Sequence, residues 1–280
     1  MRNNLYESQY SRIVCWIPHC CDFLPLSPNA DPKIVSKLKE DNLLLTDNIA
    51  DRVHFCKGQI IKGEYSRFFC DLERFPDDSK EGMSRVGMGM LYNRFIDGSI
   101  LDRTVFDPAI NPTAYYQRKH RELKEAVERT GDGCLLLDLH TFTPQPLPCD
   151  QDQNAERPDI CIGINHDDTC PKYINQAVEY LNGRRFKTFV NKPFSGSMTV
   201  DTSVKYKSVM IEINKRFYGW NPLQHRPDDF WGIGPEFANI MRFFTTFYCR
   251  NGEQIGCSLV FHFYTAFYSG FFFFTLCFGT

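Results

Sequence analysis

Short apolar runs alternate along this chain with longer segments in which apolar residues recur at every third or fourth position. The apolar runs predict buried β-strands, and the periodic segments predict amphipathic helices. We expect strands at residues 13–18, 66–72, 134–139, 159–164, 188–190 and 209–213, and helices at 32–40, 46–53, 112–130 and 170–182. Fully apolar strands that alternate with helices favour an α/β architecture in layers, with a mostly parallel sheet.

Two of these strands lead directly to a histidine. His19 follows the run at 13–18, and His140 follows the run at 134–139. Because ligands of such sheets bind at the carboxyl ends of the strands, we expect both imidazoles at one edge of the sheet. Two histidines and one carboxylate would complete the three protein ligands of a catalytic zinc site, which keeps its fourth position open.

The carboxylate of that set could be Asp22 or Asp47. Asp47 also fits the N-cap of a helix, a role that Thr46 could fill instead. Asp138 lies two residues before His140 on the same predicted strand, so both side chains point to one side. It could orient a metal ligand, or it could be a buried aspartate that accepts hydrogen bonds from backbone N–H groups.

Glu212 interrupts the apolar run at 209–213. A carboxylate in an apolar strand needs a partner, a metal or a raised pKa. Beside a zinc-bound water such a glutamate is the usual general base. An ion pair with Lys215 or Arg216 would also explain it.

The stretch "YSRFFCDLERFPDD" contains two arginines, Arg67 and Arg74, around Asp71. On a strand, Arg67 and Asp71 share a face, so one arginine could pair with Asp71 and the other could hold a substrate carboxylate. A structural network of salt bridges fits the spacing equally well. Cys20 beside His19 suggests a nucleophilic pair, but adjacent residues on an extended segment point apart.

The composition limits the function further. A chain of 280 residues suits one large α/β domain or two small ones. Its net charge of −2 gives no reason to expect nucleic acid as a partner. The twelve cysteines are scattered, and the first residues are polar without an apolar signal core, so we expect free thiols and a cytoplasmic location.

The last 25 residues, 256–280, contain no Asp, Glu, Lys or Arg. An apolar run of about 20 residues can span a bilayer, so a C-terminal membrane anchor is one interpretation. The run consists largely of Phe and Tyr rather than Leu, Ile and Val, which favours an error in the predicted gene instead. We treat 1–250 as the catalytic domain and 256–280 as a separate aromatic tail.

From about Ile13 to Tyr218 the chain resembles the N-formylglutamate amidohydrolase family. The resemblance rests on the order and spacing of eight blocks: "IPHCCDFLP", "TDNIADRV", "YSRFFCDLERFPDD", "YYQRKHREL", "LLLDLHTF", "RPDICIGINHDDTC", "VNKPFSGSMT" and "MIEINKRFYG". It implies a three-layer α/β/α fold around a mixed sheet, of the zinc-exopeptidase-like (phosphorylase/hydrolase-like) kind. It also implies a metal-dependent hydrolase that splits N-formyl-L-glutamate into formate and glutamate in histidine degradation.

The resemblance also implies roles for single residues. It assigns one Zn²⁺ to His19, Asp47 and His140, and prefers Asp47 to Asp22 because family members usually lack a carboxylate at the latter position. Glu212 corresponds to the general base. The substrate carboxylates fall to Arg67 and Arg74, and the developing oxyanion or the leaving amine falls to His120.

The sequence departs from the family's pattern at two places. Glu73 replaces the family's usual Asn, and Cys20–Cys21 replace a small residue and Gly after the "PH" pair. Both changes weaken the expectation that N-formylglutamate is the substrate more than they weaken the expectation of metal-dependent hydrolysis. They leave open an inactive hydrolase-like binding module, or a carboxypeptidase or aminoacylase with another N-acyl amino acid as its partner.

Overall fold

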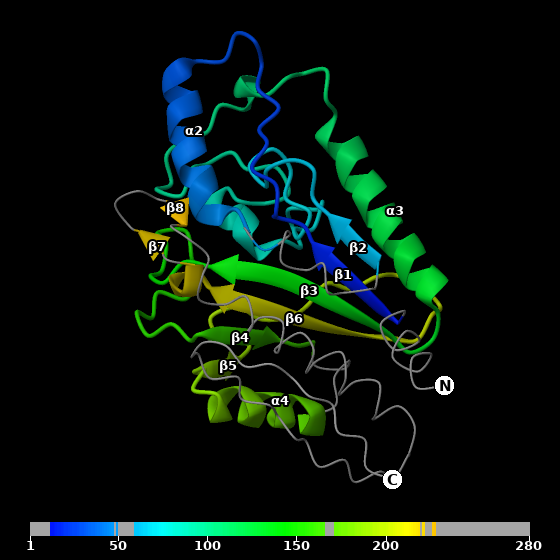
Figure 1. The fold of residues 1–280 in the computed structure, drawn as a ribbon. Coiled ribbons are helices and arrows are strands. Elements are labelled where there is room, and N and C mark those ends of the chain that lie inside the picture. Colours follow the sequence, from blue (N-terminus) through cyan, green and yellow to red (C-terminus); the bar gives the residue numbers. More distant parts are fainter. Residues whose placement is uncertain are drawn as a thin grey trace, which may run out of the picture.

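The computed structural model describes residues 12–47, 49, 59–165, 171–218, 220–221 and 226–227. Its centre is a six-stranded sheet in the order β2-β1-β3-β6-β4-β5 (Figure 1). Every neighbouring pair is parallel except β4 and β6, so the sheet is mixed and mostly parallel, as predicted. The strands are β1 (Ile13–Ile17), β2 (Gln59–Lys62), β3 (Cys134–Phe142), β4 (Ile160–Gly163), β5 (Thr188–Val190) and β6 (Tyr206–Asn214).

Helices cover both faces of this sheet (Figure 1). Helices α2 (Pro32–Leu45) and α3 (Pro112–Thr130) lie on one side, and α4 (Pro171–Gly183) lies on the other. Short 3₁₀ turns η2 (Gly82–Val86), η3 (Arg103–Val105) and η4 (Lys215–Tyr218), with the two-residue strands β7 (Trp220–Asn221) and β8 (Arg226–Pro227), complete the described elements. Among the described residues, no helix is long and apolar enough to cross a membrane. The aromatic tail at 256–280 lies outside them.

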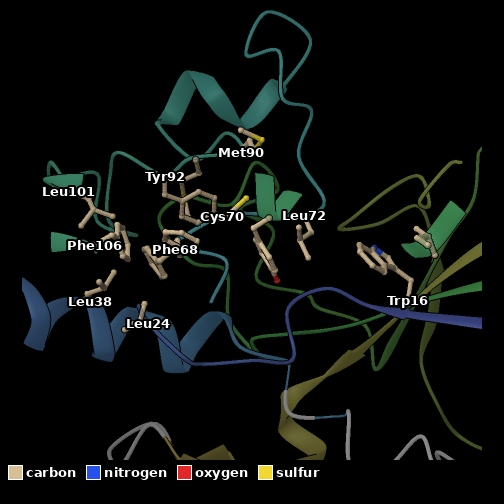
Figure 2. Close-up of a cluster of buried hydrophobic side chains, with 14 of the residues drawn as sticks. Trp16, Leu24, Leu38, Phe68, Cys70, Leu72, Met90, Tyr92, Leu101 and Phe106 are labelled. Carbon is tan, nitrogen blue, oxygen red and sulfur yellow. The ribbon is translucent and has the colours of Figure 1, made fainter. Parts of the chain in front are cut away.

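The two faces of the sheet have separate cores because side chains alternate along each strand. On β3, Leu135, Leu137 and Leu139 pack toward α4, whereas Leu136 packs toward α3. The α3-side core also includes the irregular chain between β2 and α3, with its aromatic cluster around Phe68 and Tyr92 (Figure 2). These two cores make the protein a three-layer α/β/α structure.

The boundaries of α3 agree with those predicted from the sequence, because one end carries a helix-start signal and the other a helix-stop signal. Asn111 caps the first turn by accepting a hydrogen bond from the Ala114 N–H at 3.1 Å, and Pro112 occupies the first helical position. Gly131 ends the helix with a φ of +79°, a conformation that favours glycine. Leu123 and Val127 are buried as an amphipathic helix requires.

The expected strand at 66–72 was wrong. The segment is a series of turns in which Phe69 N–H donates to the Ser66 carbonyl and Asp71 N–H donates to the Met90 carbonyl. Its apolar side chains are fully buried in the cluster of Figure 2, so the pattern correctly indicated burial but not an extended backbone. Conversely, β2 was missed because its four residues form an edge strand with little apolar periodicity.

The expected helix at 46–53 is also wrong for the residues of this range that the structure describes. Thr46 is the C-cap of α2, since its N–H donates to the Asn42 carbonyl, and its backbone is extended. Asp47 is non-helical as well, and its carboxylate accepts hydrogen bonds from Thr141 on β3. The remainder of that segment, apart from Ile49, lies outside the described residues.

Gly63 allows the end of β2 to approach the segment that carries His19. Its N–H donates to the Ile17 carbonyl at 3.0 Å, and a Cβ at this position would lie 1.9 Å from the carbonyl oxygen of Pro18. Backbone must therefore move before any larger residue fits. The turn that presents His19 depends on this close contact.

We expect Gly63→Ala to destabilise the protein by at least about 2 kcal/mol, because overpacking against backbone cannot be relieved by a rotamer change. On a chain of this size that is a decrease in Tm of roughly 4–8 °C. Gly183→Ala is the matched control, since a Cβ there meets nothing within 4 Å. Thermal unfolding of both variants decides the point, and equal Tm values would contradict it.

Candidate active site

The three central strands bring their polar residues to one face of the sheet. His140 and Glu212 are direct partners across β3 and β6, and Asp138 shares their face two residues earlier. His19 follows β1, which is the other neighbour of β3. The two histidines therefore meet at the carboxyl edge as expected, with ring centroids 5.1 Å apart. His140 lies within β3 rather than after it, because the strand runs on to Phe142.

One carboxylate oxygen faces a nitrogen from each histidine. Asp47 Oδ2 lies 3.1 Å from His140 Nδ1 and 3.7 Å from His19 Nδ1. All three residues are buried, and their ligand atoms lie within 4.8 Å of one another. Ligands about 2 Å from a tetrahedral zinc stand about 3.3 Å apart, so the observed distances bracket the spacing that zinc requires.

The second nitrogen of each ring is held by another carboxylate. His19 Nε2 donates to Asp71 Oδ1 at 2.8 Å, and His140 Nε2 donates to Asp138 Oδ1 at 2.7 Å. Metal-binding histidines commonly have such a partner, which fixes the ring and its tautomer. Both Nδ1 atoms are thereby directed at Asp47. Asp138 also accepts the Met198 N–H at 2.9 Å, so it has both of the environments considered for it.

His19 Nδ1 is the atom that points most directly to a cation. It is buried and has no hydrogen-bond partner among the described residues. Since Nε2 carries the proton that Asp71 accepts, Nδ1 presents a lone pair toward the carboxylate of Asp47 at a distance too long for a hydrogen bond. Two electron-rich atoms that face each other in a buried site are stabilised by a metal ion between them.

Asp47 is held by the neighbouring strand. Its Oδ1 accepts hydrogen bonds from the Thr141 N–H at 2.9 Å and the Thr141 hydroxyl at 2.6 Å, which leaves Oδ2 for the histidines. Burial opposes ionisation, but the hydrogen bond and the charge of His140 lower the pKa of Asp47 below its usual value. Asp22, the other candidate ligand, is exposed and belongs to no metal-sized group of described residues.

His140 lies between two carboxylates. Burial favours the neutral ring, but the charges and hydrogen bonds of Asp138 and Asp47 raise the pKa of His140 well above its ordinary value. A metal bound at Nδ1 would have to displace a proton from this imidazolium. Metal affinity at the site should therefore decrease as the pH falls.

A second group of potential ligands shares His140. It contains Glu73 and Asp138 as well. Here the imidazole offers Nε2, which is already bonded to Asp138, and Glu73 Oε1 lies 4.0 Å away from that nitrogen. This group has no counterpart to the unpaired His19 Nδ1, so the donors favour the set with Asp47.

Glu212 is buried beside this set. Desolvation, opposed by the charge of His140, raises the pKa of Glu212 to about 7. The two cations suggested as ion-pair partners of Glu212 are Lys215 and Arg216, and both have other contacts in the structure. Lys215 donates to the Leu44 carbonyl, and Arg216 contacts Asp159. A carboxyl group with a pKa near neutrality can accept and return a proton at physiological pH.

The two arginines differ in their pairing. Arg67 donates to Asp71 Oδ2 at 2.8 and 3.1 Å and to the Tyr92 hydroxyl at 2.9 Å. Arg74 lies 3.8 Å from Asp71, and its buried Nε has no hydrogen-bond partner among the described residues. Arg74 Nε also lies 4.0 Å from Glu81 Oε1, so this nitrogen has two carboxylates nearby but no hydrogen bond to either of them.

Glu73 contacts Trp16 and His140, because the segment that carries it is a series of turns and not a strand. Its Oε1 accepts from the Trp16 indole N–H. Burial first, and the nearby Asp138 second, raise the pKa of Glu73 well above its usual value. A protonated Glu73 carries no charge that would repel a substrate carboxylate.

His120 lies on α3 with its ring stacked on Tyr116, at a centroid distance of 4.0 Å. Its Nε2 donates to the Leu72 carbonyl at 2.9 Å, and burial lowers the pKa of His120. The neutral ring consequently presents Nδ1 as an acceptor only. Tyr116 and His120 thus belong to the half-buried side of α3 that faces the site, rather than to its core face.

A cavity of about 660 Å³ opens onto these groups. Its wall includes the predicted residues His19, Arg67, Arg74, His120, His140 and Glu212. Sequence reasoning missed two residues of this wall, Tyr92 and Thr141, and it missed Trp16, whose indole N–H donates to Glu73. Only Thr141 had a signal, as the residue that follows His140. Cys20 is a poor nucleophile, because burial and then Asp47 raise the pKa of its thiol to about 12.

The cysteines that the structure describes form no disulfide bond with one another. They are Cys15, Cys20, Cys21, Cys70, Cys134, Cys149 and Cys161. Within the described part of the chain this agrees with the expectation from their spacing.

Comparisons with known proteins agree with this architecture. The family model for N-formylglutamate amidohydrolase matches residues 11–219. A crystal structure of N-formylglutamate amidohydrolase from Ralstonia eutropha JMP134 is 19% identical, with a TM-score of 0.59 over 85% of this chain and 92% of that one. A gene product of Agrobacterium tumefaciens is 13% identical, with a TM-score of 0.54 over 84% and 91%. No curated protein sequence matches. At these identities the structures establish the fold alone.

We expect the purified protein to bind one zinc ion and His140→Ala to lose it. Asp138→Asn should reduce zinc affinity by about 10–100-fold, because it weakens the group that orients His140. Competition with a chromogenic chelator measures both. Asp97→Asn, at an exposed residue paired with Lys37, is the matched control. Zinc binding that is unchanged in His140→Ala would contradict the assignment.

Proposed function

The chain belongs to the N-formylglutamate amidohydrolase family, and on that premise we propose that it is a zinc-dependent hydrolase of N-formyl-L-glutamate. The products would be formate and glutamate. The observation that carries the proposal is the buried set of His19, Asp47 and His140, in which the Nδ1 atoms of both histidines converge on one carboxylate oxygen beside Glu212. Such a set with an open position is that of a catalytic zinc site.

A zinc ion bound to these residues would supply a Lewis acid and lower the pKa of a bound water toward about 7. The protein's own groups do the remaining work. Glu212 accepts the proton from the attacking water and then delivers it to the departing nitrogen, so the C–N bond breaks with a neutral amine as leaving group. Its pKa of about 7 suits both steps.

The carboxylates of the substrate have one evident partner. Arg74 lines the cavity and has a buried Nε without a hydrogen-bond partner among the described residues. A guanidinium binds a carboxylate through two parallel hydrogen bonds. Arg67 is committed to Asp71 and Tyr92, so it contributes mainly positive charge and the position of Asp71.

His120 had two roles open to it, and its hydrogen bonding favours one of them. An oxyanion requires a donor, but the Nε2 proton of His120 is already given to Leu72. Nδ1 can instead accept an N–H from the substrate amide or the leaving amine. We therefore assign His120 to the amine side of the scissile bond.

The alternatives have less support. An inactive binding module would not need the three proposed metal ligands and Glu212, yet all four residues are present and buried. A cysteine hydrolase would need a thiolate, which the raised pKa of Cys20 disfavours. A carboxypeptidase or aminoacylase would share the same metal ligands and base, so it differs in substrate rather than in mechanism.

We expect Glu212→Gln to reduce kcat/KM for N-formylglutamate by at least about 100-fold, the usual contribution of a positioned general base. In the wild type, kcat/KM should increase as the pH rises through the pKa of Glu212, because only the ionised carboxylate accepts a proton. The midpoint should lie at or below pH 7, since a bound dication favours the ionised form. A pH profile measures this. Glu156→Gln, at an exposed residue, is the control; a Glu212→Gln enzyme with wild-type activity would exclude the mechanism.

We expect Arg74→Ala to lower kcat/KM for N-formylglutamate by a factor of roughly 30 or more, the cost of losing a bidentate carboxylate contact. The kcat/KM for N-formylmethionine, whose side chain has no carboxylate, should decrease much less. Steady-state kinetics with both substrates gives the ratio, and Arg94→Ala on the exposed surface is the control. Equal losses for the two substrates would show that Arg74 does not recognise the side-chain carboxylate.

A further inference from the structure

One part of the cavity lining is apolar. It consists of Phe142, Phe194, Met198 and Met210, here called the methionine wall. Met210 is the cross-strand partner of Asp138 and lies two residues before Glu212 on the same face of β6. The Met198 N–H donates to Asp138, and Phe142 packs edge-on against Phe194 at 5.7 Å.

The methionine wall is preformed, because hydrogen bonds hold its segments in place. The segment that carries Phe194 and Met198 is bound to the sheet by hydrogen bonds between Ser197 and Asn165 at 3.0 and 3.1 Å, and between the hydroxyls of Ser197 and Ser208 at 2.5 Å. A preformed apolar surface binds an apolar group without a cost of ordering it. Thioethers also adapt to different shapes.

The two carboxylates that hold the histidines contact different parts of the cavity lining. Asp71, which holds His19, also contacts Arg67 and Arg74. Asp138, which holds His140, contacts the methionine wall instead. A substrate that places its carboxylate on Arg74 and its scissile carbonyl carbon beside Glu212 therefore directs its acyl group toward the methionine wall.

A formyl group would use little of this surface. It presents one hydrogen atom where the wall presents two aromatic rings and two thioethers. The cavity of about 660 Å³ has room for roughly 20 water molecules, whereas N-formylglutamate has only about twelve non-hydrogen atoms.

We propose that the methionine wall is an acyl-binding surface and that the enzyme also hydrolyses N-acyl glutamates with short aliphatic acyl chains. The inference rests on the proposed function and extends it on the acyl side. The reaction is the same hydrolysis: the C–N bond breaks, the acyl carbon gains the oxygen of water, and the amine gains a proton. The products are a short-chain carboxylate and glutamate, with no co-reactant besides water.

The test is a series of N-acetyl, N-propionyl and N-butyryl glutamate, with N-formylglutamate as the reference. Each methylene buried on the wall should increase kcat/KM by about two- to fourfold from acetyl to butyryl. A series that is flat or decreasing overturns the proposal. Formyl is left out of the slope because formamides differ from longer amides in intrinsic reactivity.

Two variants locate the effect. Met198→Gln keeps the length of a half-buried side chain but makes the wall polar, so the increase per methylene should disappear. Met83→Gln makes the same change on a half-buried cavity residue of the 3₁₀ turn η2, outside the methionine wall, and should retain the increase. The same slope in Met198→Gln and wild type overturns the assignment to this wall.

A binding measurement separates this inference from the proposed function. Calorimetric titration of the Glu212→Gln protein, loaded with zinc, with the same four compounds gives affinities without turnover. An affinity that increases from acetyl to butyryl supports the acyl-binding surface even if wild type hydrolyses none of the compounds, which would refute the proposed activity. Equal affinities overturn the acyl-binding surface even if N-formylglutamate is cleaved.

Discussion

The ionised carboxylate of Asp47 is the constraint on which the site depends. A buried charge is tolerated only with compensating partners, and Asp47 finds them on two strands: Thr141 on β3 and the histidines that follow β1 and lie on β3. Its backbone N–H in addition donates to the His19 carbonyl at 2.8 Å. The end of α2 is thereby tied to the two strands that supply the imidazoles, so helix, sheet and site share one polar centre.

The same electrostatics explains why the candidate metal site has carboxylates on its outer side as well. Asp71 and Asp138 each hold one histidine through Nε2, and Asp71 is in turn held by Arg67 and by the Tyr92 hydroxyl at 2.5 Å. Each ring is fixed from behind, and its lone pair or proton is directed inward. This order, carboxylate then imidazole then metal position, makes the ligands stronger bases than isolated histidines.

Much of this arrangement follows from sequence because it depends on strand periodicity. Residues two apart on a strand share a face, which placed Asp138 with His140, whereas the pairing of β3 with β6 that sets Glu212 opposite His140 is seen only in the structure. The contacts of the 66–74 segment did not follow. There the apolar residues are buried by turns rather than by an extended strand, so strand alternation does not place Glu73, which lies beside Trp16 and His140. Turns held by distant partners such as Met90 leave no local signal.

Glu73 shows how a local rule fails where a tertiary environment decides. Read as a charged residue, it excludes an acidic substrate from the cavity that it lines. In the structure it is close to Asp138, and burial makes its ionised form costly, so the pKa of Glu73 is raised and the neutral acid is favoured. A neutral carboxyl group offers one donor and one acceptor, much as a carboxamide does. The departure from the family's asparagine therefore changes the hydrogen-bonding pattern at this position far less than it changes the formal charge.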